Sequence, residues 1–129
     1  MSGIIHRLTL AAAVAWVCVP VPAPAIAQDI DLDAIFRCEG GMAADRCLAA
    51  RDLILNNCTV CHMFVPIVLQ QWNTEEWHAL LERHLGNDRV PHLESEEVVL
   101  IETYLAANFN PELSPPELPA ALLEAWTSY

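Results

Sequence analysis

The residues best suited to chemistry lie in one run of five, which reads C-T-V-C-H from Cys58 to His62. Two thiols three positions apart can each add to one of the two vinyl groups on one edge of a haem, which forms two thioethers. The next residue then presents an imidazole to the iron, and its other ring N–H bonds to a backbone carbonyl that orients the ring. The pattern predicts one covalently bound haem c, attached at Cys58 and Cys61, with His62 as an axial iron ligand.

Three other interpretations of these cysteines compete with haem. A redox-active C-x-x-C pair belongs in a thioredoxin-like βαβ unit, and the chain has no strand pattern. A zinc site would need Cys38 and Cys47 as further ligands, but that outer pair lacks the spacing of a zinc knuckle. Chance occurrence of the motif is the third.

The elements that must position the motif are helical. We predict a helix over 43–55, stopped by the pair Asn56-Asn57, and then an apolar loop over 63–72 that contains Pro66. Three more helices are expected: 74–85 capped by Asn73 or Thr74, 95–107 capped by Ser95, and a short piece over 119–126. The fold class is therefore all-α, with three or four short helices around one covalently bound haem.

The chain divides into three parts. Residues 1–27 have a basic start, an apolar run and an Ala25-Ile26-Ala27 cleavage signal, which predicts a secretory signal peptide. A retained membrane anchor is the alternative, although the apolar run is short for a membrane span. Residues 28–110 form the haem domain. The Pro-rich extension 111–129 is too apolar for a solvated tail, so we expect it to pack on the domain or on a partner.

Charge limits the classes of partner. The 129 residues contain 17 acidic and six basic side chains, and every basic one is arginine. Without residues 1–27, five arginines face 17 carboxylates, a formal charge of −12. This balance argues against nucleic acid and is compatible with a redox partner that has a basic docking surface. Solubility alone is the other reading of the charge.

Residues 43–111 resemble small class I-like cytochrome c domains. The likeness rests on the helix before the motif, the acidic helix with Glu76-Trp77, and the last helix, which begins Ser95-Glu96-Glu97. In that family the last helix packs across the helix that precedes the attachment motif. The resemblance implies electron transfer and a periplasmic location.

The second axial ligand departs from the family pattern, in which a downstream Met is usual. Met63 is adjacent to His62 and cannot reach the opposite face of a haem, and Met42 precedes the motif. His84 takes the place that a distal Met has in some relatives, seven residues after a Trp. His92 follows Pro91, as Met follows Pro in many other cytochromes c. We expect His84 as the ligand, with His92 or an open position as alternatives.

Two further features complete the predicted site. Arg83 and Arg89 flank the distal region and are the natural bidentate partners of haem propionates, unless they only form surface salt bridges. Cys38 and Cys47 enclose a small loop and can form a disulfide after export, with a catalytic dithiol as the sharper alternative.

The functional prediction is a periplasmic, single-haem electron carrier or electron-transfer subunit with two histidine ligands to iron, and no enzyme activity of its own. A haem-based ligand-binding or sensing protein with a displaceable distal histidine is the alternative. A third possibility is an interaction subunit of a larger redox complex, in which the haem is structural.

Overall fold

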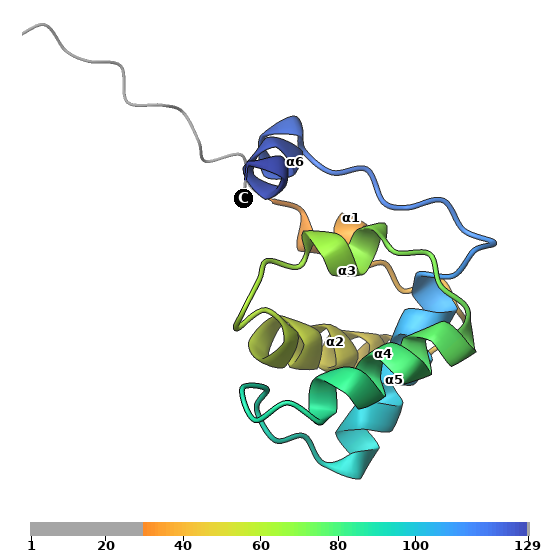
Figure 1. Ribbon diagram of the computed structural model, residues 1–129. Helices are drawn as coiled ribbons and strands as arrows, with labels where there is room; N and C mark the ends of the chain where they lie inside the picture. The colour runs from red at the N-terminus through yellow and green to blue at the C-terminus, as the bar shows by residue number, and fades with distance from the viewer. Residues whose placement is uncertain (1–29, 129) are drawn as a thin grey trace, which may run out of the picture.

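The computed structural model describes residues 30–128, and within this range the fold is helical without strands (Figure 1). The predicted signal peptide, residues 1–27, lies outside the described residues. No helix within 30–128 combines the length and apolar character needed to cross a bilayer. The all-α prediction is therefore confirmed for the part of the chain that the structure describes.

Six α-helices and one π-helical turn make up this fold. In chain order they are α1 (Leu32–Ile35), α2 (Ala44–Leu53), the π-turn η1 (Ile54–Cys58), α3 (Val65–Leu69), α4 (Thr74–Leu85), α5 (Ser95–Asn108) and α6 (Ala120–Thr127). The helix α4 begins as predicted, because Asn73 and Glu76 form a reciprocal capping box. The cap of α5 is Glu94 rather than Ser95, with Glu97 as its partner in a second capping box.

Two local predictions are wrong. The pair Asn56-Asn57 does not stop the helix, which continues as η1 through Cys58. The Asn57 side chain donates to the carbonyl of Leu53 at 2.8 Å, so its amide supports the turn instead of ending it. The predicted loop 63–72 contains the helix α3, in which Pro66 lies in the first turn, where a missing N–H breaks no helical bond.

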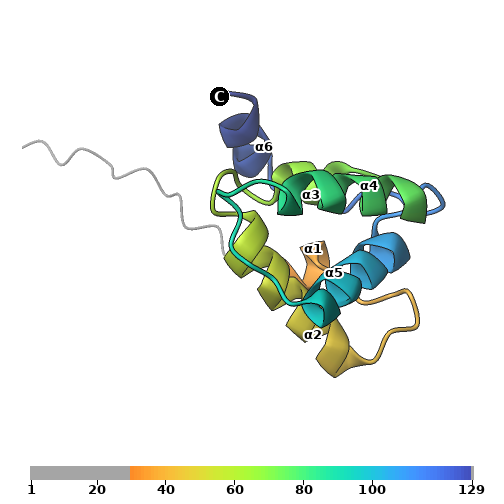
Figure 2. The same ribbon diagram turned by 60° about the horizontal axis from the view of Figure 1, so that its bottom comes forward.

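The core forms where α2 and α4 pack against α5 (Figure 2). Its largest fully buried side chains come from α4, α5 and the residue that follows α5: Trp77, Tyr104 and Phe109. The indole N–H of Trp77 donates to the carbonyl of Phe109 at 2.8 Å, which joins the start of α4 to the end of α5. This core holds α4 and η1 in place at the site described below.

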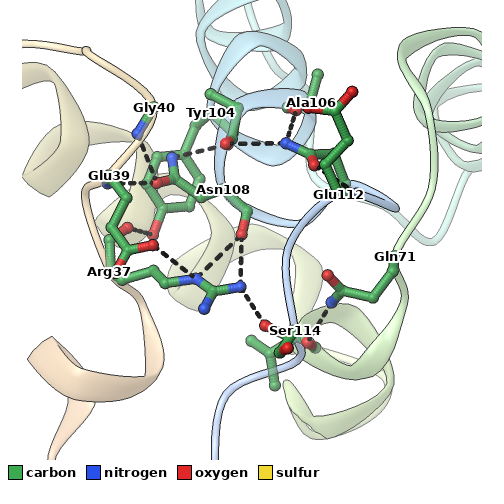
Figure 3. A network of polar contacts seen from close by, with 12 residues as sticks. Arg37, Glu39, Gly40, Gln71, Tyr104, Ala106, Asn108, Glu112 and Ser114 are labelled. Carbon is green, nitrogen blue, oxygen red and sulfur yellow. Dashed lines mark hydrogen bonds and ion pairs between the residues drawn. The ribbon is translucent and has the colours of Figure 1, made fainter.

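A polar network ties the residues before α2 to the end of α5 (Figure 3). The fully buried Asn108 accepts from the backbone N–H of Glu39 at 2.7 Å and donates to the carbonyl of Tyr104 at 3.0 Å. The Arg37 guanidinium donates to the carbonyls of Asn108, at 3.1 Å, and Ser114, at 2.6 Å. The second of these bonds fixes the start of the C-terminal extension to the domain.

Two cysteines of the described range that precede the motif pair with each other. Cys38 and Cys47 lie within disulfide-bonding distance, with their Cα atoms 5.8 Å apart. Cys47 is buried on α2, so the pair joins the preceding loop to the core. Gly40 in that loop lies against Ala107 of α5, where the space for a side chain is closed.

Candidate functional site

One largely apolar cavity of about 500 Å³ collects most of the predicted site residues. It lies between η1, α3, α4 and the chain that follows α4, with Trp126 of α6 on its wall. Trp77 and Leu81 of α4 and Leu105 of α5 supply buried apolar surface to it. Its volume is within the range of small-molecule and cofactor sites.

Both motif cysteines line this cavity, in different environments. Cys58 ends η1, is partly buried and packs against the core, while Cys61 is exposed. Burial raises the pKa of the Cys58 thiol, because the thiolate would lose its hydration. The continuation of the helix through Cys58 therefore places the first thiol at the core side of the cavity, and the second lies nearer to solvent.

His62 also lines the cavity, and a backbone carbonyl orients its ring. Its Nδ1 lies 2.8 Å from the carbonyl oxygen of Met63. A carbonyl only accepts, so Nδ1 carries the hydrogen and donates it. The lone pair of Nε2 is then available as a metal ligand, with the carbonyl as the outer partner that metal-bound histidines usually have.

His84 lines the same cavity from the last turn of α4, as the prediction of a distal ligand requires. Its Nδ1 lies 2.9 Å from the carbonyl oxygen of Leu80, so this ring also donates from Nδ1 and keeps Nε2 available. The residue as a whole is exposed, unlike Trp77 and Leu81 on the same helix.

His92, the alternative distal ligand, is not brought to this cavity. Its side chain is 87% exposed, and its Nε2 lies 3.6 Å from a carboxylate oxygen of Glu94. It lines a separate open pocket of about 610 Å³ with His78 and Glu102. There the hydrogen bond from His78 to Glu102 and the negative charge of that residue raise the pKa of His78.

The two arginines predicted to bind propionates are placed differently. Arg89 lines the cavity, whereas Arg83 is exposed on the last turn of α4 and does not. Neither guanidinium forms an ion pair with a residue in the described range 30–128, so the surface salt bridges considered as their alternative role are not present there.

The four cysteines within residues 30–128 do not converge on a zinc site. Cys38 pairs with Cys47, and only the second pair reaches the cavity. Across residues 30–128 no three His, Cys, Asp or Glu side chains cluster closely enough to hold a metal ion on their own. A haem site does not need such a cluster, because the porphyrin supplies four ligands to the iron and the protein supplies at most two.

Trp126 lines the cavity from the far end of the chain, and no spacing in the sequence predicted it as part of the site. The extension was predicted to pack on the domain or on a partner, and its apolar side chains were the only signal. In the structure α6 lies beside α3 (Figure 1). The indole of Trp126 is part of the cavity wall.

These residues fit a covalently attached haem. The cavity is largely apolar, as a macrocycle requires, and two thiols and two imidazoles with available Nε2 atoms line it. No protein-family model, curated protein or solved structure matches the chain.

Proposed function

We propose that this protein is an exported, single-haem c-type cytochrome that transfers electrons. The observation that carries the proposal is that the C-x-x-C-H motif opens onto an apolar cavity that a second histidine also lines. Cys58 and Cys61 would form the thioethers, His62 and His84 would be the axial ligands, and Arg89 would pair with a propionate. The packing of α5 against α2 is also what the resemblance to cytochrome c domains predicts.

When bound, the haem would supply a one-electron ferric–ferrous couple. Each histidine would be held in one tautomer by its carbonyl partner, Met63 for His62 and Leu80 for His84. Met/His ligation raises a haem potential, so two histidines would place this protein at the low side of the cytochrome c range. A periplasmic location follows from the predicted signal peptide, and the acidic surface suits a basic redox partner.

A haem-based ligand-binding or sensing function is the second candidate. It is favoured by the exposure of His84 and by its place in the last turn of α4, where a side chain is easier to displace than in a helix interior. Carbon monoxide separates the two functions. An electron carrier with firm bis-histidine ligation leaves the reduced spectrum unchanged on addition of the gas, and a sensor shifts it.

Covalent attachment is the decisive test. The full chain, expressed with a c-type maturation system, should keep its haem on the polypeptide after denaturation and acidic solvent extraction. Cys58→Ala together with Cys61→Ala should abolish this retention. Cys38→Ala together with Cys47→Ala is the matched control and should retain the haem. If haem extracts freely from the unmodified chain, the proposal is wrong.

A further inference from the structure

The C-terminal extension reaches the candidate haem cavity along a path fixed at two points. Near its start, the Arg37 guanidinium donates to the carbonyl of Ser114 at 2.6 Å. Farther along, Leu118 packs against the hydrophobic core. The segment from Ser114 to Leu118 is therefore held on the domain. The helix α6, which follows it, packs on the side of the cavity where α3 lies.

The helix α6 contributes nothing to the core itself. None of its residues is buried, and α3 is the helix that it packs against (Figure 1). Trp126 is the residue of α6 that lines the cavity, and it is partly buried there. Leu123, one turn earlier, is 37% exposed and does not line the cavity. The helix thus has one large apolar side chain with a position at the site.

We propose that Trp126 is a positioning residue that closes the outer wall of the haem cavity and shields the iron from water and small ligands. This inference rests on the proposed function. An indole covers a large apolar area with few rotatable bonds, so it excludes water at low entropic cost. Cys61 and His84 line the cavity as exposed residues, so the site needs a further apolar side chain to exclude water.

The shielding has two physical consequences. Water and competing ligands reach the iron more slowly, because closing an apolar site expels them. The reduction potential also rises, since a drier surrounding disfavours the ferric state, which carries the additional positive charge. Without the indole, we expect faster ligand entry and a lower potential, while α2, α4 and α5 keep their packing.

The test compares three variants of the haem-loaded full chain. Trp126→Ala should raise the rate of cyanide binding to the ferric protein by about tenfold, because the closing wall is lost. Its reduction potential should fall, and hydrogen–deuterium exchange should increase in 54–58 and 65–69. Trp126→Phe should restore most of the shielding, with a cyanide-binding rate and a reduction potential close to those of the unmodified chain. Leu123→Ala, the matched control one turn before Trp126 on α6 and absent from the cavity lining, should behave as the unmodified chain.

The outcomes separate this inference from the proposed function. If the unmodified chain carries no covalent haem, the proposed function fails and the inference fails with it. Suppose that haem is attached, and that Trp126→Ala and Leu123→Ala have the same rate of cyanide binding and the same reduction potential. Only the inference is then overturned. Thermal melts and circular dichroism should show that Trp126→Ala keeps its helices, since no residue of α6 is buried. A variant with lost helix content would contradict a local shielding role.

Discussion

At the scale of single residues, the same arrangement occurs on two histidines. The Nδ1 of His62 and the Nδ1 of His84 each donate to a backbone carbonyl, and both rings line one cavity. The carbonyls select the tautomer that leaves Nε2 available to a metal. His92 has neither the carbonyl partner nor the position.

This difference predicts opposite results for two alanine variants. His84→Ala should turn the ferric iron high-spin and let the reduced protein bind carbon monoxide, because the sixth position loses its ligand. His92→Ala should keep the low-spin spectrum of the unmodified protein. Optical and paramagnetic-resonance spectra of the two variants measure this. A high-spin His92→Ala and a low-spin His84→Ala would move the assignment to His92.

The reactivity of the Cys58 thiol should depend on whether the chain is folded. Burial raises the pKa of Cys58 in the folded protein. Only the thiolate is nucleophilic, so at any pH below its pKa the buried thiol reacts more slowly. In haem-free Cys61→Ala, we expect the alkylation of Cys58 to need a higher pH in the folded chain than in denaturant. Equal pH profiles in the two conditions would contradict the burial of Cys58.

At the scale of elements, the loop before α2 fits closely onto α5. A Cβ added at Gly40 would clash with the Cβ of Ala107, and the Gly40 N–H donates to the buried Asn108. The loop is therefore positioned by contact with α5 and by the Cys38–Cys47 pair at its ends. The Gly40–Ala107 contact and the Arg37 hydrogen bonds both hold the residues before α2 against the end of α5, where the extension begins.

Two glycine variants test this contact. Gly40→Ala should destabilise the fold by about 1–3 kcal/mol, because the new methyl group must displace α5 or the loop. Gly86→Ala is the control, since the nearest atom to a Cβ there is the carbonyl oxygen of Glu82 at an ordinary 3.6 Å. Thermal melts should show a drop of at least several degrees for the first variant and almost none for the second. Equal melting temperatures would mean that the loop is not held against α5.

At the scale of the whole molecule, net negative charge dominates the surface. The described residues and the full chain contain far more carboxylates than arginines, and no lysine occurs. Such a field accelerates encounters with cationic partners and slows encounters with anionic ones. The local charge at the cavity has the opposite sign to the net charge, because Arg89 and no carboxylate lines it.

The field predicts a charge preference in electron exchange. A cationic small redox reagent should react faster with the haem-loaded protein than an anionic reagent of similar potential. The two rate constants should converge as ionic strength rises, because salt screens surface charge over about 10 Å at 0.1 M. Stopped-flow measurements over a salt series provide the check. A faster anionic reagent would show that the local charge of Arg89 outweighs the net charge.

Local signals in the sequence were sufficient for much of the fold. A cap at Asn73 or Thr74 and the periodic apolar residues predicted α4, and α5 begins and ends within one residue of its predicted bounds. These local signals gave a wrong prediction where a residue type can either end or support a helix. Asn57 bonds back to Leu53 and continues the helix, and Pro66 opens α3 instead of interrupting a loop.

The residues that carry the candidate chemistry can be identified from the sequence, because the C-x-x-C-H spacing is a property of five adjacent positions. Which distant side chains meet that motif depends on tertiary packing. His84 and Arg89 reach the cavity while His92 and Arg83 do not, and Trp126 arrives from the far end of the chain. Spacing along the chain orders residues within one helix. The positions of residues on different segments depend on how α4 packs on α5 and where the extension is tied down, which are properties of the assembled core.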